Sequence, residues 1–242
     1  MKKYELTTNT KIVFGKKLLQ IKALVSFGDV AAGDFGGYIE KEENLSHDGE
    51  SWVSGDARVY GNAWVSGDAR VSGDAQVSGD ARVSGDARVS GDAWVSGNAQ
   101  VYGNAWVYGD ARVSGDARVY GNAWVSGDAR VSGNAQVYGN AWVSGDARVS
   151  GDAQVSGDAR VSGDARVSGD AWVSGNADYI CFKRFGSEGR NTTMSRTKNG
   201  DIYVCCGCFT GSLKEFSENV KEYLACVEVA KIHFEIGEKD DK

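Results

Sequence analysis

Between Val53 and Asp178, apolar side chains recur with a period of six residues. Twenty-one consecutive units read V-S/Y-G-D/N-A-R/Q/W with few exceptions. Within a unit the pattern alternates, with Ala57 and Val59 directed inward and Arg58 outward, which is the two-residue period of a short β-strand. Gly followed by Asp or Asn supplies a corner, because these residues adopt positive φ more readily than most others. The pattern predicts an array of short strands separated by tight corners.

A unit of six residues is too short to bury its own apolar side chains, so the units must stack as a solenoid. Each unit contributes one valine and one alanine to a narrow core, and a fully buried valine is worth roughly 1.5 to 3 kcal/mol. Many stacked units are therefore needed for a stable fold.

The valine and the small alanine four residues later resemble the pattern of the hexapeptide-repeat superfamily, and the match covers residues 53–178. Members of this superfamily form left-handed parallel β-helices with three units in each triangular coil. The resemblance implies a mainly β protein with a single left-handed parallel β-helix of about seven coils. At a coil spacing of about 4.8 Å, the prism would be roughly 34 Å long.

The use of charged residues divides the chain into three parts. Every lysine and every glutamate lies outside the array, which uses only Arg and Asp. We expect an N-terminal cap over residues 1–52, the β-helix over 53–178 and a C-terminal capping or assembly domain over 179–242. In the first part, Ile39 and Leu45 stand six residues apart and fit a degenerate first coil. Both ends would cover open sheet edges, which otherwise invite pairing with another copy.

The C-terminal part has the pattern of a β-hairpin followed by a helix. Tyr179–Phe185 and Ile202–Cys208 are predicted strands, and Lys198–Asp201 is a predicted turn. Ser212 and Glu215 have the spacing of a capping box at the start of a helix. The apolar stripe of this helix would consist of Leu213, Phe216, Val220, Tyr223, Leu224 and Val227.

Both flanking regions resemble uncharacterised hexapeptide-repeat proteins of phages, prophages and Firmicutes. The resemblance lies in residues 21–24, 28–40 and 44–46 of the head and in the C-G-C-F-T-G segment at 206–211 of the tail. Those proteins carry a G-S-R-N-like stretch that is interrupted here at residues 186–191. The resemblance implies a phage setting and no activity.

Composition limits the classes of partner. The net charge of −6 disfavours nucleic acid, which needs a concentrated basic surface. The chain shows neither a signal peptide nor an apolar stretch of about 20 residues, so we expect no membrane partner and a location in the cytoplasm of the bacterial host. Five cysteines, an odd number, make a poor disulfide framework.

Candidate chemistry is sparse. The acyltransferases of the superfamily rely on a catalytic histidine, whereas His47 and His233 both lie outside the array. We therefore predict no catalytic residues, no enzyme activity and no cofactor. Acyl transfer is kept as a remote alternative.

The cysteines at 205, 206 and 208, with Cys181, form one cluster without the second pair that structural zinc usually requires. We therefore predict no metal site. Strand alternation would place Cys206 and Cys208 together as buried apolar residues.

Residues eighteen apart should stack directly on one face of the prism. Two columns are then aromatic in three consecutive coils and form a candidate interaction surface: Trp106, Trp124, Trp142, Tyr102, Tyr120 and Tyr138. Exposed Trp and Tyr are enriched at interfaces, so these ladders could bind a flat protein surface or sugar rings. Alternatively, the stacked aromatics and Arg–Trp contacts simply protect the sheet.

One corner column is entirely acidic, and a neighbouring row is rich in arginine. Its members are Asp56, Asp74, Asp92, Asp110, Asp128, Asp146 and Asp164. We expect turn residues balanced by arginines. Calcium is the alternative, although one carboxylate per coil supplies few of the 6 to 8 oxygens that it takes.

A long internal duplication rotates the faces. Residues 64–99 and 142–177 are identical, and their offset of 78 residues equals four coils and one further unit. The second copy is therefore turned onto a neighbouring face, which disfavours a ligand site in the copied blocks. The aromatic coils around residues 100–142 lie between the copies.

These observations favour a non-enzymatic, phage- or prophage-associated binding or scaffold protein. Its β-helix would be a rigid spacer or a protein-interaction surface, and inhibition of a host protein is one form of this function. A protein partner or self-association into a homo-oligomer is expected. The alternatives are a carbohydrate-binding module that uses the ladders and, remotely, a hexapeptide-repeat acyltransferase.

Overall fold

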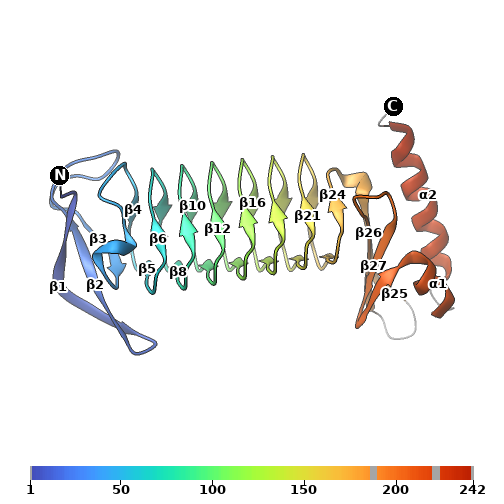
Figure 1. The fold of residues 1–242 in the computed structure, drawn as a ribbon, viewed down its shortest axis with the longest axis horizontal. Helices are drawn as coiled ribbons and strands as arrows, with labels where there is room; N and C mark the ends of the chain where they lie inside the picture. The colour runs from blue at the N-terminus through green and yellow to red at the C-terminus, as the bar shows by residue number, and fades with distance from the viewer. Residues whose placement is uncertain (1, 186–189, 220–223, 241–242) are drawn as a thin grey trace.

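The chain folds into a straight column of stacked coils with a different cap at each end (Figure 1). The structure is a computed structural model and describes residues 2–185, 190–219 and 224–240. The prediction of a mainly β solenoid is confirmed.

Three parallel sheets form the faces of the prism, and each array strand consists of an outward residue and the valine after it. Face 1 also continues the N-terminal strands, and its order is β1 (Tyr4–Val13), β2 (Lys16–Ala23), β3 (Phe35–Ile39), β5 (Arg58–Val59), β8 (Gln76–Val77), β11 (Trp94–Val95), β14 (Arg112–Val113), β17 (Arg130–Val131), β20 (Arg148–Val149) and β23 (Arg166–Val167). Face 2 contains β4 (Trp52–Val53), β7 (Arg70–Val71), β10 (Arg88–Val89), β13 (Trp106–Val107), β16 (Trp124–Val125), β19 (Trp142–Val143) and β22 (Arg160–Val161). Face 3 contains β6 (Trp64–Val65), β9 (Arg82–Val83), β12 (Gln100–Val101), β15 (Arg118–Val119), β18 (Gln136–Val137), β21 (Gln154–Val155) and β24 (Trp172–Val173).

The array pairs with a register of eighteen residues, as in Trp106 with Trp124 and Val107 with Val125. The valines at the repeated inward positions from Val53 to Val173 and the alanines from Ala57 to Ala171 are buried, whereas Ala177, in the last unit, is exposed. The corner glycines stack on one another with positive φ. Gly121, for example, has φ 72°, and a Cβ there would lie 3.1 Å from the backbone nitrogen of Gly139. Both the backbone angle and the close approach explain why glycine recurs at this position.

Residues before the array add a degenerate coil, so the solenoid has about eight turns. Ile39 pairs with Val59, and Leu45 forms a bridge with Val65. A 3₁₀ helix, η1 (Glu42–Asn44), lies between these two positions. Ile39 and Leu45 thus pair with the first array units that lie above them, Val59 and Val65.

The duplication does rotate the faces. Trp64 begins a strand of face 3, whereas its counterpart in the second copy, Trp142, begins a strand of face 2. The two identical segments therefore present the same side chains in different directions.

At the N-terminus, the β1–β2 hairpin extends face 1 and brings a buried lysine over the first coil. The Lys3 ammonium donates hydrogen bonds to the carbonyl oxygens of Gly49 and Ser51, at 3.2 and 2.8 Å. Burial, followed by repulsion from Arg70, lowers the pKa of Lys3 from 10.5 to about 8.

This shift predicts a pH dependence of stability. Between pH 8 and 10.5 the unfolded chain holds a proton that folded Lys3 has released, so the free energy of unfolding rises with pH. From pH 7.5 to 9.5 the wild type should gain on the order of 1–2 kcal/mol relative to Lys3→Met. Urea unfolding of both proteins measures this difference, in which other titrating groups cancel. A constant difference across this range would contradict the role of Lys3.

The C-terminal part is larger than the predicted hairpin and helix. After the 3₁₀ helix η2 (Asn176–Asp178), the described residues form four antiparallel strands of one sheet and then two helices: β25 (Tyr179–Phe185), β26 (Arg190–Arg196), β27 (Ile202–Cys206), β28 (Phe209–Ser212), α1 (Leu213–Asn219) and α2 (Leu224–Asp240). The predicted turn before Ile202 is present. However, the strand that enters it is β26, which the sequence prediction missed, and Tyr179–Phe185 pairs on the far side of β26.

The capping box is confirmed, but the helical stripe is only partly correct. The backbone N–H of Glu215 donates to the Ser212 hydroxyl at 3.2 Å, and the Ser212 backbone N–H donates to the Glu215 carboxylate at 2.9 Å. Phe216 and Val227 are buried, and Leu213 packs partly against the same core. Leu224, the first residue of α2, is exposed. Val220 and Tyr223 lie outside the described residues, as does most of the segment 186–191.

The helices of the described chain are short or polar. None of them is both long enough and apolar enough to cross a membrane.

Candidate interaction surface

The predicted tryptophan and tyrosine columns flank the same corner of the prism. The sequence Y-G-N-A-W occurs at 102–106, 120–124 and 138–142, each time running from face 3 to face 2. We call this three-coil corner the aromatic ridge, and it consists of Tyr102, Tyr120, Tyr138, Asn104, Asn122, Asn140, Trp106, Trp124 and Trp142. A fourth copy at 60–64 lies on another corner, because it is displaced by two coils and one unit.

The tyrosine rings are stacked parallel along the prism axis. Their centroids are 4.9 Å apart for Tyr102 and Tyr120 and 5.0 Å apart for Tyr120 and Tyr138, with interplanar angles of 3° and 5°. The hydroxyls of Tyr120 and Tyr138 lie 3.2 Å from the amide oxygens of Gln136 and Gln154, to which they donate. Burial, followed by the neighbouring tyrosines, raises the pKa of Tyr120.

The tryptophan column is stacked too, and an arginine lies at each end. Trp106 and Trp124 are parallel, at 5.2 Å and 4°, whereas Trp124 and Trp142 meet edge to face, at 5.7 Å and 61°. The Arg88 guanidinium lies 4.8 Å from the Trp106 ring, and that of Arg160 lies 5.8 Å from Trp142. Trp124, at the centre, is the most exposed of the three, at 37%.

This stacking determines which part of each ring a partner can reach. Parallel rings in consecutive coils turn their faces toward one another along the axis and their edges outward. A sugar binds aromatic residues through the ring face, and most of these faces are already covered by a neighbouring ring or guanidinium. The outward ring edges carry partial positive charge and favour carbonyl oxygens or further aromatic rings.

The asparagines complete an uncharged ridge, a feature that the sequence prediction did not single out. Asn104 donates to Asn122 at 3.2 Å, Asn122 to Asn140 at 3.1 Å and Asn140 to Asp158 at 3.0 Å. The signal was present in the sequence, because the three asparagines share the eighteen-residue spacing of the aromatics.

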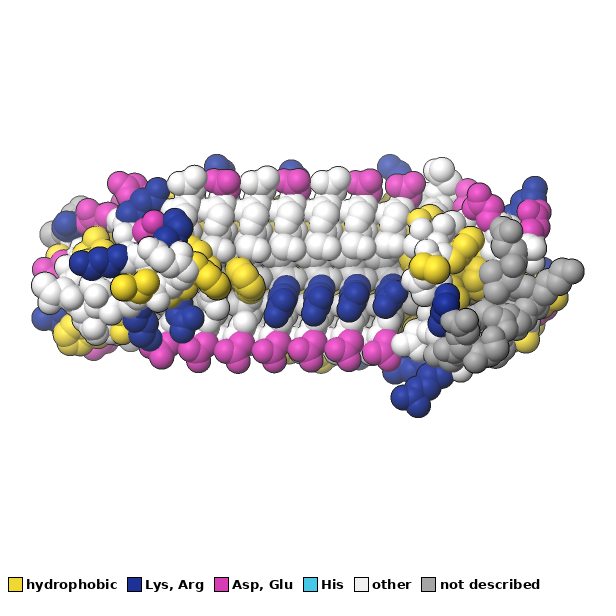
Figure 2. Space-filling model, turned by 90° about the horizontal axis from the view of Figure 1, so that it is seen from below, with side chains coloured by type: hydrophobic (Ala, Val, Ile, Leu, Met, Phe, Trp, Pro, Cys, Tyr) yellow, Lys and Arg dark blue, Asp and Glu magenta, His cyan; other side chains and the backbone are white. Residues whose placement is uncertain are grey.

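The other two corners are acidic by comparison. Figure 2 shows face 1 between them, with a continuous acidic row along one edge and alternating acidic and uncharged side chains along the other. In the alternating column, each asparagine donates to the next aspartate, as from Asn98 to Asp116 at 2.8 Å.

The predicted balancing of the acidic column by its arginine row is weak. Arg58 and Asp74, 3.8 Å apart, form the one ion pair between that column and its arginine row among the described residues. Lysines from the two caps approach the ends of the column instead: Lys11 pairs with Asp56, and Lys183 lies 3.8 Å from Asp164.

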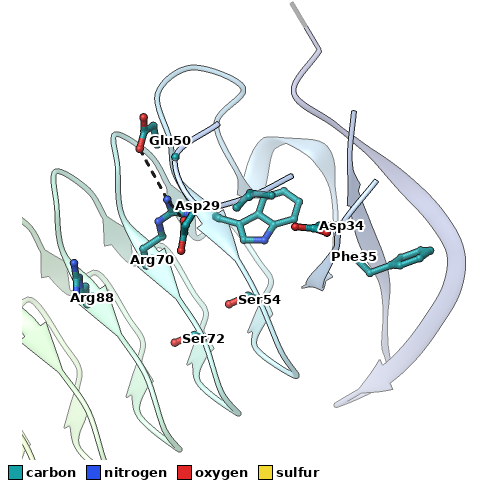
Figure 3. Close-up of a pocket in the computed structure, with 11 residues that line it drawn as sticks. Asp29, Asp34, Phe35, Glu50, Ser54, Arg70, Ser72 and Arg88 are labelled. Atoms are coloured by element: carbon teal, nitrogen blue, oxygen red, sulfur yellow. Dashed lines mark ion pairs between the residues drawn. The ribbon is translucent and has the colours of Figure 1, made fainter. Parts of the chain in front are cut away.

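A groove of about 680 Å³ separates the loop before β3 from face 2 (Figure 3). Inside it, the Arg70 guanidinium is 2.5 Å from Asp29 and 4.0 Å from Glu50, so its charge is neutralised locally. Arg88 lines the end of the groove and also contacts Trp106, the first tryptophan of the aromatic ridge. Arg88 is therefore shared between the lining of the groove and the end of the ridge.

The two histidines lie in opposite caps. His47 stacks on Tyr4 at 4.3 Å and accepts the backbone N–H of Lys3, whereas His233 packs against Phe234 on α2. Neither belongs to the array, so a site that joins them does not form.

The cysteines are not arranged as strand alternation predicted. Cys205 and Cys206 are both buried, but β27 ends at Cys206, and Cys208 is exposed in the following turn. The expectation that Cys206 and Cys208 are buried together was therefore wrong. Within the described part of the chain, no group of three or more His, Cys, Asp or Glu residues is arranged to hold a metal ion.

Comparison with known proteins identifies the repeat. The model of the YdcK beta solenoid repeat matches eleven overlapping segments, which together cover residues 53–97 and 99–175. No curated protein matches the chain. The matched segments make up half of the sequence and coincide with the three-sheet prism. The chain therefore belongs to the YdcK beta-solenoid repeat family.

Proposed function

We propose that this protein is a non-enzymatic binding or scaffold protein whose rigid prism presents the aromatic ridge to a protein partner. The setting that we propose is a phage or prophage acting in the cytoplasm of a bacterial host, where inhibition of a host protein is one form of this function. The resemblance of the head and tail segments supports that setting.

The observation that carries the proposal is the uncharged, aromatic character of one corner over three consecutive coils. Elsewhere the corner columns are acidic or alternate between asparagine and aspartate, and this column itself has Asp86 and Asp158 on either side of the ridge. Desolvating a carboxylate is costly, whereas tyrosine and tryptophan supply large contact areas at protein interfaces. A partner that covers the ridge therefore incurs a smaller desolvation penalty than one that covers the acidic parts of the corners.

The shape and chemistry of the ridge indicate the kind of partner. A convex corner fits a groove, and outward ring edges and amide groups favour a groove lined by apolar side chains and backbone carbonyls. We therefore propose a folded protein with an uncharged groove at least three coil spacings long, or roughly 14 Å. The covered ring faces disfavour a sugar.

A matched pair of triple variants tests this function. The ridge variant combines Trp106→Gln, Trp124→Gln and Trp142→Gln, and the control combines Trp64→Gln, Trp94→Gln and Trp172→Gln. Glutamine occupies the same position of the unit elsewhere, as at Gln136, so both variants should fold. A partner captured from the host and identified by mass spectrometry is purified, and its Kd is measured for all three proteins.

We expect the ridge variant to bind at least roughly 30-fold more weakly and the control to bind like the wild type, because truncating an interface hot spot costs about 2 kcal/mol or more. Equal affinity for all three proteins would reject the ridge as the binding surface. Glycan binding that only the ridge variant loses would establish a carbohydrate module instead. Self-association with the same dependence, measured by sedimentation, would identify a second copy as the partner.

A further inference from the structure

Side chains on this prism make diagonal contacts with the next coil, between residues i and i+16. Ser78 and Trp94 form one such pair, and Ser126 and Trp142 form another: in each, the indole N–H donates to the serine hydroxyl at 3.1 Å. An indole held in this way leans across the serine of the preceding coil. Both serines are buried, with 6% and 5% of their surface exposed.

Trp124 occupies the same geometric position but meets a different neighbour. Residue 108 is a tyrosine, in a face-2 row that is otherwise serine: Ser54, Ser72, Ser90, Ser126, Ser144 and Ser162. The rings of Tyr108 and Trp124 meet edge to face, with centroids 6.3 Å apart and planes at 80°. Tyr108 therefore fills the place in which the Trp124 indole would otherwise lie.

With that place filled, Trp124 stacks parallel on Trp106. Ser90, the diagonal neighbour of Trp106, is less deeply buried than Ser78 or Ser126, consistent with an indole that does not lean over it. Trp94 and Trp142 thus lean over a serine, whereas Trp106 and Trp124 stand upright against each other, and the tyrosine at 108 lies beside this upright pair.

We propose that Tyr108 is the positioning residue of the aromatic ridge: it holds Trp124 upright against Trp106 and so exposes the central indole to a partner. This inference rests on the proposed function for its biological meaning. The orientation itself can be measured without any partner.

The test uses full-length protein labelled with ¹⁵N at the indole nitrogens, and the Trp124 signal is assigned with Trp124→Phe. In the wild type, the indole N–H groups of Trp94 and Trp142 should exchange slowly with water, because they are hydrogen-bonded to serine, and that of Trp124 should exchange quickly. In Tyr108→Ser, the indole of Trp124 should lean onto the new serine and donate a hydrogen bond to it. Exchange of this indole N–H with water should then slow by at least about tenfold, because the hydrogen bond must open before the proton exchanges.

Two further variants make the test specific. Tyr108→Phe retains the ring and should leave Trp124 as in the wild type. Ser78→Tyr places a tyrosine before Trp94 and should speed the exchange of the Trp94 indole N–H. Unchanged exchange of Trp124 in Tyr108→Ser, with the rest of the spectrum preserved, would overturn the positioning role.

Partner binding separates this inference from the proposed function. We expect Tyr108→Ser to weaken partner binding by at least about fivefold, because the Trp124 indole would be withdrawn from the interface. Tyr108→Phe should leave the affinity for the partner unchanged. If Trp124 leans over but affinity is retained, while the triple ridge variant still loses it, the claim that Tyr108 serves binding is wrong. If the triple variant also binds normally, the proposed function fails, whereas the exchange data still decide the role of Tyr108.

Discussion

Removal of residues 179–242 should make the protein pair tail to tail. In the full chain, backbone N–H groups of the last coil are capped by side chains: that of Arg160 donates to Asn176 at 2.9 Å, and that of Arg166 donates to Thr193, also at 2.9 Å. Thr197, the residue after β26, also forms a bridge with Ala171 of the last coil. Truncation retains Asn176 but removes Thr193 and β26, and the parallel-sheet edge that they cover becomes a template for pairing with another chain.

The N-terminal cap still covers the other end of the truncated prism, so association should stop at twice the mass of the truncated chain. Removing residues 1–51 as well should give open-ended assemblies, because both ends are then free. Light scattering over a concentration series measures the masses. Adding Val167→Lys to the single truncation places an inward-pointing charge at the open end and should prevent pairing. A truncated chain with the association state of the full-length protein would show that β26 is not needed as a cap.

Deletion of the single unit 130–135 should weaken partner binding even though the prism survives. The six-residue deletion moves Tyr138 and Trp142 onto a neighbouring corner and leaves only two coils of the ridge in register. Because the continuity of the ridge is lost, we expect affinity to fall by at least about tenfold, which corresponds to 1.4 kcal/mol.

Deletion of the unit 76–81 is the matched control. It also removes six residues and rotates the two ends of the chain against each other, but it leaves all three ridge coils in register. Circular dichroism and thermal unfolding establish that both proteins fold. Wild-type affinity in the control, measured by calorimetry, would support the ridge. Equal loss in both proteins would mean that the prism acts as a spacer that fixes the relative orientation of its two ends.

The regular part of the fold could be predicted because one physical rule repeats in every unit. Valine and alanine face inward, glycine turns the corner, and the rule extends to the degenerate coil at Ile39 and Leu45. The C-terminal sheet follows no such rule. Strand β26 reads R-N-T-T-M-S-R, and its sequence lacks apolar alternation. Its buried positions include the polar residues Thr192 and Ser195 as well as Met194, so the pattern does not indicate a strand.

The candidate surface was predictable in part. The eighteen-residue spacing placed the aromatic columns correctly, because in-register stacking follows from sequence position alone. The orientation of the rings did not follow, since it depends on the diagonal neighbour sixteen residues away. That neighbour is Ser126 for the leaning Trp142 and Tyr108 for the upright Trp124, whereas Trp106, whose neighbour is Ser90, stacks parallel on Trp124.

The three-sided coil limits how such a surface can grow. Copying eighteen residues lengthens a ridge, whereas copying any number of units that is not a multiple of three moves the next aromatic motif to another corner. The stray Y-G-N-A-W at 60–64 and the rotated 36-residue duplication are what growth in single units leaves behind. The length of the ridge therefore depends on insertions of whole turns, and a gain or loss of one unit takes the ridge out of register while it leaves the valine and alanine core intact.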